Sequence, residues 1–125
     1  MSPVAYSIEV VTHASAGETS LTKSQLRRIY SMRQLRWTNG ETIVVFTLPS
    51  SHPLHQQFSK ELLRIFPYQL DRIWNKLTYS GVGSPPIIVE TPQALLEAVA
   101  KTPGAIGYGE GIKENSNVLV IKIKG

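Results

Sequence analysis

The sequence predicts one α/β domain, in which a mixed sheet of five short strands carries helices on its faces. Short apolar runs alternate along the chain with segments of helical spacing, which is the pattern of this fold class. The length of 125 residues leaves room for one ordinary core, so we expect a single domain over residues 1–125. No apolar run is long enough to cross a bilayer, and we expect no transmembrane segment.

The N-terminal third is expected to hold a strand, a loop and a helix. Val4–Val11 is rich in β-branched residues and alternates poorly, as a strand buried on both faces would. His13–Ser20 is polar and contains a glycine, which predicts a loop. A helix then begins at Thr22, because Thr22 and Gln25 have the spacing of a capping box.

The middle of the chain predicts a turn, a strand and two helices. Asn39-Gly40 indicates the turn, and Glu41–Leu48 follows it as a strand. The segment Pro49–Pro53 breaks the chain and opens a helix, whose apolar residues repeat with helical spacing as far as Ile65. Pro67 ends this helix, and a second helix follows it.

The last third predicts strand, helix, strand and strand. Ile87–Val89 is a short apolar run. Thr91-Pro92 begins a helix, with the threonine as N-cap and the proline at the first helical position. Two final strands are expected at Ala105–Gly109 and Val118–Ile123, with a polar turn between them.

The modest positive charge of the chain favours weak attraction of small anions over binding of nucleic acid. The chain has 13 Lys+Arg against 9 Asp+Glu, a formal net charge of +4, and residues 23–36 are the one stretch that is basic without interleaved acids. Arg27, Arg28 and Arg33 lie largely off the apolar stripe of the first helix, so solvated surface is their simplest explanation. Because no groove-reading motif accompanies the charge, we expect no nucleic-acid binding.

Enzymatic chemistry has no support in the sequence. There is no cysteine, which removes thiolate nucleophiles and thiolate metal sites together. His52 and His55 could share a helix face, but no third ligand lies at a recognisable spacing. The glycines at 81–83 and 107–111 form no complete nucleotide-binding motif, and turns explain them better. We therefore expect no enzyme, no metal and no cofactor.

The segment Thr47–His55 is the most informative for ligand binding. A strand ends there and leads directly into a helix, which places serine hydroxyls and unpaired backbone N–H groups at the positive end of that helix. An oxyanion could bind at such a position without a metal. The alternative is that Ser50 or Ser51 only caps the helix, which explains the same residues.

Three stretches taken together resemble a known family. The first is residues 21–30, followed by Trp37 and Asn39-Gly40. The second consists of Phe58, Trp74, Tyr79-Ser80-Gly81 and Pro85-Pro86. The third is Val99–Tyr108, which contains Thr-Pro-Gly-Ala-Ile-Gly-Tyr. In this order and spacing they resemble the phosphate-type substrate-binding proteins of ABC transporters, within the periplasmic-binding-protein-like superfamily. The chain is similar to the short single-lobe members of that group.

The resemblance implies a fold of two α/β lobes closing on an oxyanion, of which this chain looks like one lobe. The family's hydroxyl cluster maps onto Ser50, Ser51 and His52, which become the expected oxyanion site. No Gly-Thr follows these serines, and Thr47 and Leu48 stand where family members often have an arginine. The first residues carry no secretory signal, yet the resemblance implies the periplasm, with a signal removed from the native chain.

Two functions follow as expectations. The first is a non-enzymatic binding or accessory domain that binds phosphate or a similar oxyanion at Ser50, Ser51 and His52. The second is a protein-interaction or sensory domain with a vestigial ligand site, for which a protein partner or a homodimer would complete the missing lobe. That alternative predicts an apolar patch that includes residues near Trp37 or Tyr79.

Overall fold

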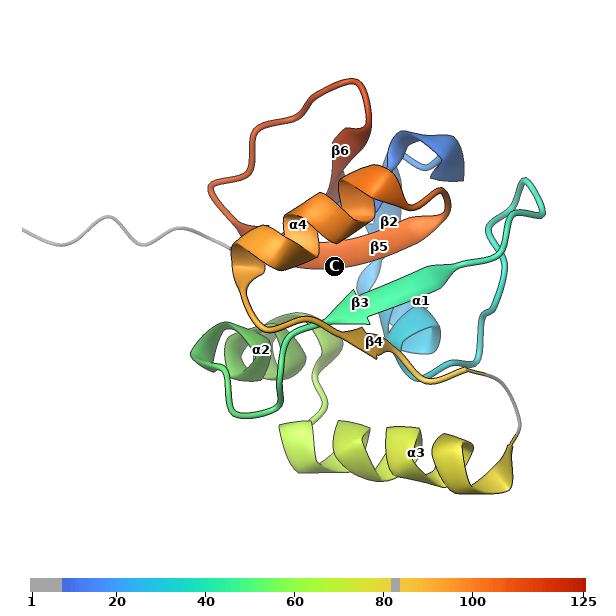
Figure 1. The fold of residues 1–125 in the computed structure, drawn as a ribbon, viewed down its shortest axis with the longest axis vertical. Helices are drawn as coiled ribbons and strands as arrows, with labels where there is room; N and C mark the ends of the chain where they lie inside the picture. Colours follow the sequence, from blue (N-terminus) through green and yellow to red (C-terminus); the bar gives the residue numbers. More distant parts are fainter. Residues whose placement is uncertain (1–7, 82–83) are drawn as a thin grey trace, which may run out of the picture.

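The computed structural model describes residues 8–81 and 84–125, and in this part of the chain it forms one mixed sheet covered by helices (Figure 1). The strands run in the spatial order β2-β6-β1-β5-β3-β4. Their bounds are β1 Ile8–His13, β2 Ser20–Thr22, β3 Val44–Thr47, β4 Ile87–Ile88, β5 Ala105–Glu110 and β6 Val118–Lys124. The helices are α1 Lys23–Tyr30, α2 Pro53–Phe58, α3 Pro67–Ser80 and α4 Pro92–Lys101, with a 3₁₀ turn at Ala14–Ala16 and a π-helical turn at Ser59–Leu63 that continues α2.

The predicted α/β class is confirmed, but the expected five strands are wrong, because the described sheet has six. The additional strand is β2, which lies at the end of the segment expected to be a loop and pairs in parallel with β6. A strand of three residues is too short to show a period-two pattern, so the sequence gives no signal for it. The expected first strand is observed from Ile8, and its residues 4–7 lie outside the described range.

The strand directions gather three strand ends at one edge of the sheet. β3 pairs in parallel with both β4 and β5, so these three strands end on the same side. β1 runs antiparallel to β5 and to β6. The chain leaves β3 for α2 and leaves β4 for α4, so two helices begin from this edge (Figure 1).

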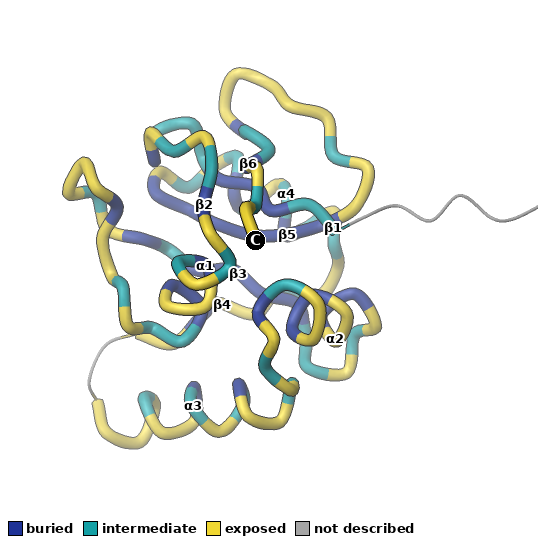
Figure 2. The backbone as a smooth tube through the Cα atoms, turned by 180° about the vertical axis from the view of Figure 1, so that it is seen from behind, coloured by how far each residue is buried: buried dark blue, intermediate teal, exposed yellow. Residues whose placement is uncertain are grey.

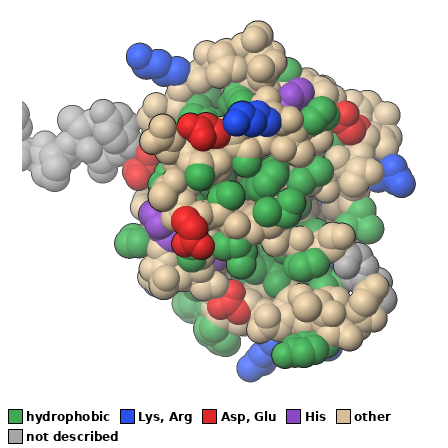
Figure 3. Space-filling model, viewed as in Figure 1, with side chains coloured by type: hydrophobic (Ala, Val, Ile, Leu, Met, Phe, Trp, Pro, Cys, Tyr) green, Lys and Arg blue, Asp and Glu red, His purple; other side chains and the backbone are tan. Residues whose placement is uncertain are grey.

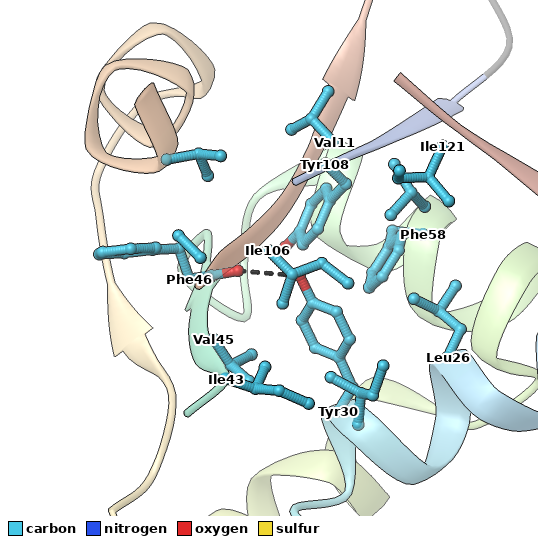
Figure 4. Packing of buried hydrophobic residues seen from close by; sticks show 14 of the residues in the cluster. Val11, Leu26, Tyr30, Ile43, Val45, Phe46, Phe58, Ile106, Tyr108 and Ile121 are labelled. Carbon is cyan, nitrogen blue, oxygen red and sulfur yellow. Dashed lines mark hydrogen bonds between the residues drawn. The ribbon is translucent and has the colours of Figure 1, made fainter. Parts of the chain in front are cut away.

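Both faces of the sheet are covered, and two adjacent residues of β5 show this. A Cβ built on Gly107 would meet the side chain of Leu95 in α4 at 2.2 Å, so glycine lets α4 pack closely on this face. Tyr108 points to the opposite face, where its ring stacks on Phe58 with centroids 3.9 Å apart. The edge of Tyr30 in α1 closes the same cluster (Figure 4).

The helix boundaries confirm the capping predictions. Thr22 accepts from the N–H of Gln25 at 3.0 Å while Gln25 accepts from the N–H of Thr22 at 2.8 Å, a complete capping box. Thr91 accepts from the N–H of Ala94 at 3.1 Å and begins α4. Pro67 occupies the first turn of α3, but the expectation that it ends the preceding helix is wrong, because that helix ends at Leu63 and Arg64 follows in a left-handed conformation with φ of 59°.

The outer surface of α3 is the most exposed helical surface in the described residues (Figure 2). Its inner side is held by Leu70 and Trp74, and the indole N–H of Trp74 donates to the carbonyl of Tyr30 at 2.8 Å. Tyr79 is 90% exposed, whereas Trp37 is buried and donates from its indole N–H to the carbonyl of Gly104 at 2.9 Å. Trp37 therefore contributes to the core and not to a surface patch.

Candidate functional site

The candidate site lies where β3 ends and α2 begins. Ligands of open α/β sheets bind outside the carboxyl ends of the strands, and β3, β4 and β5 share that edge here. Two helix starts face it, with His52 as N-cap of α2 and Thr91 as N-cap of α4. Each helix start adds a partial positive charge from its unpaired N–H groups.

The three predicted site residues are neighbours in one turn, but they do different things. His52 caps α2, because its Nδ1 accepts from the N–H of Leu54 at 3.1 Å. Ser50 donates from its hydroxyl to Asp71 Oδ1 at 2.5 Å, which joins this turn to α3. Ser51 is exposed, and neither its hydroxyl nor its N–H has a hydrogen-bond partner among the described residues. Ser51 is therefore the donor that remains available to a ligand.

Asp71 changes the electrostatics of this turn. Its carboxylate accepts the hydrogen bond that the Ser50 hydroxyl donates, so this hydroxyl has no donor left for a ligand and offers it only lone pairs. The carboxylate is also a negative charge beside the expected oxyanion position, and like charges repel at short range. Sequence reasoning did not find Asp71, since it lies 21 residues from Ser50 and on another helix.

A buried polar cluster lies directly behind the turn and was also missed. The hydroxyl of Tyr108 accepts from the N–H of Leu48 at 3.0 Å and lies 2.7 Å from His55 Nδ1. Thr47 Oγ1 lies 2.9 Å from the same hydroxyl and 3.1 Å from His55 Nδ1. Thr47, His55 and Tyr108 thus fill the interior at the end of β3.

Burial favours the neutral ring of His55 over the charged one. Since the Tyr108 hydroxyl already accepts from Leu48, its own proton can be donated to His55 Nδ1 or to Thr47 Oγ1. His55 Nε2 is buried and has no hydrogen-bond partner among the described residues. Burial lowers the pKa of His55, while the Asp71 carboxylate raises it and His52 lowers it. Burial also disfavours the charged form of Tyr108, and this raises the pKa of Tyr108 to about 12.

The expectation of a shared histidine face is not met. His55 points inward to Tyr108, and His52 uses its Nδ1 as a helix cap, so the two rings serve different partners. Over residues 8–81 and 84–125 no group of three possible metal ligands is present.

A second polar cluster joins His13, Ser15 and Glu41. The Ser15 hydroxyl donates to Glu41 Oε1 at 2.7 Å and accepts from the N–H of Gly104 at 2.9 Å. His13 Nδ1 accepts from the N–H of Ser15 at 3.0 Å. In a hydrolytic triad the carboxylate contacts the histidine, whereas here it contacts the serine. His13 Nδ1 also lies 2.9 Å from the Ser15 hydroxyl oxygen, and the cluster ties the loop after β1 to the loops before β3 and β5.

Comparison with known proteins shows the fold. No protein-family model matches the chain, and no curated protein matches its sequence. Among solved structures, an ABC-type phosphate transport receptor from Vibrio cholerae is similar at a TM-score of 0.72 and 19% identity, covering 94% of this chain and 46% of that one. A structure from Clostridium perfringens described as a phosphate ABC transporter substrate-binding protein with bound phosphate gives a TM-score of 0.73, 18% identity, and coverage of 94% and 45%.

A third similar structure is PstS from Borrelia burgdorferi, with a TM-score of 0.68, 15% identity, and coverage of 94% of this chain and 47% of that one. The chain thus spans less than half the length of these three structures. This coverage confirms the resemblance at the level of the fold and fits the expected single lobe. None of the described helices is both long and apolar enough to cross a membrane.

Proposed function

We propose that this chain is a non-enzymatic binding domain that takes phosphate or a similar oxyanion at Ser50, Ser51 and His52. The observation that carries the proposal is the free hydroxyl and N–H of Ser51, which lie at the sheet edge where α2 and α4 begin. The fold is that of proteins described as phosphate receptors, and one of them was solved with bound phosphate. From the same similarity we propose a periplasmic location and an accessory role in transport.

The proposed site should bind an oxyanion weakly, because few of its hydrogen-bond donors are free. Ser50 and His52 already use a proton and a lone pair within the protein, so Ser51 supplies most of the donated hydrogen bonds. The exposed position keeps the anion partly hydrated, and its charge-assisted bonds lose the low-dielectric surroundings that strengthen them. We therefore expect millimolar affinity for the domain alone.

Isothermal titration with phosphate and with sulfate tests the proposal. Ser51→Ala should reduce the binding heat strongly, whereas Ser116→Ala, an exposed serine in the loop before β6, should leave it unchanged. Asp71→Asn should tighten binding, because it removes the opposing charge and keeps an acceptor for Ser50. No heat at millimolar phosphate, or equal heat in Ser51→Ala, would contradict the proposal.

A second candidate function is supported by exposed apolar side chains on the outermost strand β4 and at the end of α3. Ile87 and Ile88 of the edge strand β4 are 49% and 59% exposed, and Tyr79 at the end of α3 is 90% exposed. An edge strand with unpaired backbone groups and apolar side chains favours association with another chain. We propose as the alternative that a partner protein or a second copy docks there, and light scattering across a concentration series tests for the second copy.

A further inference from the structure

The basic stretch that the proposed site does not use forms a hollow of about 350 Å³ between α1 and α3. Its polar lining comes from α1 and the turn after it, namely Ser24, Arg27, Arg28, Ser31 and Arg33. We call it the arginine hollow. On the face shown in Figure 3, by contrast, the Lys and Arg side chains are scattered among acidic ones. We propose that the arginine hollow is a second oxyanion site, which binds phosphoryl groups through Arg27, Arg28 and Arg33.

The helical spacing places four of these residues on one surface of α1. Residues 24, 27, 28 and 31 are separated by three, one and three positions, so their side chains form a single stripe. The stripe lies opposite the buried residues Leu26 and Ile29, which fix the rotation of α1 against the core. Because Leu26 and Ile29 pack against the core, Arg27 and Arg28 both face outward on the same side of α1.

The turn after α1 brings the third arginine to the first two. Met32 has φ of 63°, a left-handed conformation that is unusual for a residue with a side chain. This turn directs the chain back on the helix, so that the N–H of Arg33 donates to the carbonyl of Arg28 at 2.8 Å. The N–H of Gln34 donates to the same carbonyl at 3.2 Å. The backbone thus fixes Arg33 beside Arg28.

The first arginine is also held in place. Arg27 donates from Nε to the carbonyl of Leu63 at 2.9 Å, which joins α1 to the end of the π-helical turn. This bond uses one of the five guanidinium N–H groups and leaves both terminal nitrogens available. A guanidinium that is already oriented loses less entropy when it binds an anion.

The hollow lacks any negative charge of its own. No acidic residue lines it, and within the described ranges no ion pair engages Arg27, Arg28 or Arg33. A phosphoryl group fits these three cations better than a single carboxylate does, because it carries more charge and more acceptor oxygens. Ile65 and Ile73 supply the apolar part of the lining.

The two serines have different parts in this site. Ser31 donates its hydroxyl proton to the carbonyl of Arg27 at 2.7 Å, so it has none to give to a ligand. The Ser24 hydroxyl has no hydrogen-bond partner among the described residues and can donate to an oxyanion. The proposal does not rest on the site at Ser51, and each can fail without the other.

The test follows backbone amide shifts by nuclear magnetic resonance while pyrophosphate is added to the whole chain. A second titration uses vesicles of equal parts phosphatidylcholine and phosphatidic acid, with pure phosphatidylcholine vesicles as the reference. The variant Arg28→Gln/Arg33→Gln removes two of the three cations. Arg72→Gln removes an equally exposed arginine of α3 that does not line the hollow. Ser51→Ala reports on the other site.

We expect shifts at residues 24–33 and, from these signals, an affinity about tenfold lower in the double variant and close to wild type in Arg72→Gln. Ser51→Ala should lose only the response at the start of α2 and keep the shifts at residues 24–33. A response to pyrophosphate identifies a soluble phosphorylated ligand, and a response only to the anionic vesicles identifies a lipid head group. Either supports the phosphoryl site. No shift at residues 24–33 with either probe, or an equal loss in Arg72→Gln, overturns the proposal.

Discussion

Replacing Tyr108 by Phe removes one buried hydroxyl and keeps the ring that stacks on Phe58. The hydroxyl lies 3.0 Å from the Leu48 N–H, 2.9 Å from Thr47 Oγ1 and 2.7 Å from His55 Nδ1. Its loss leaves the Leu48 N–H and His55 Nδ1 buried without this partner. Since an unsatisfied buried polar group costs about 1–3 kcal/mol, we expect the free energy of unfolding to fall by about 2–3 kcal/mol.

Urea denaturation followed by circular dichroism measures this change. Tyr30→Phe is the matched control, because the Tyr30 hydroxyl is equally buried and donates only to the carbonyl of Phe46, at 3.0 Å. We expect the control to lose about 1 kcal/mol. A loss below about 0.5 kcal/mol in Tyr108→Phe, or a loss no larger than in Tyr30→Phe, would refute the reasoning that the buried cluster stabilises the end of β3.

Three further predictions concern packing, pH and capping. Gly107→Ala should lower the free energy of unfolding in urea by about 1–3 kcal/mol, because its Cβ would meet the Leu95 side chain at 2.2 Å. Gly109→Ala should lower it less, because its Cβ would meet the end of the Ile112 side chain at 3.0 Å. Burial lowers the pKa of folded His55 below the ordinary 6.5, so the unfolded chain binds a proton first and stability should decline as the pH falls below 6.5. His55→Asn should flatten this decline in denaturation curves recorded across pH, and an unchanged decline would contradict the assignment. Thr22→Ala should lower the thermal midpoint, at a cost of about 1 kcal/mol, and an unchanged midpoint would exclude a contribution from the capping box.

Local signals explain why most of the fold could be predicted. The capping box at Thr22 and Gln25 and the Thr91-Pro92 helix start act within one turn, so the residues that decide them are adjacent in the sequence. The strand β2 has no such signal, since its three residues become a strand only through parallel pairing with β6, about one hundred residues later. Long-range pairing of this kind cannot be read from a local pattern.

The partners of the candidate site residues could not be predicted from the sequence. Ser50, Ser51 and His52 are adjacent in the sequence. The hydrogen bond from the Ser50 hydroxyl to Asp71 of α3 cannot be predicted in the same way, because it depends on how α3 packs. The inward direction of His55 did have a signal. His55 and Phe58 are three residues apart and therefore share a helix face, and Phe58 lies on the apolar stripe.

The central claim is that the sheet edge at the start of α2 binds an oxyanion through Ser51. The most direct measurement is a phosphate titration of the isotopically labelled chain in which the amide signals of Ser51 and Thr91 are followed. The account predicts saturable shifts of both signals at millimolar phosphate, with the Ser51→Ala variant unresponsive at Thr91. Unchanged signals at both positions in the wild-type chain would contradict it.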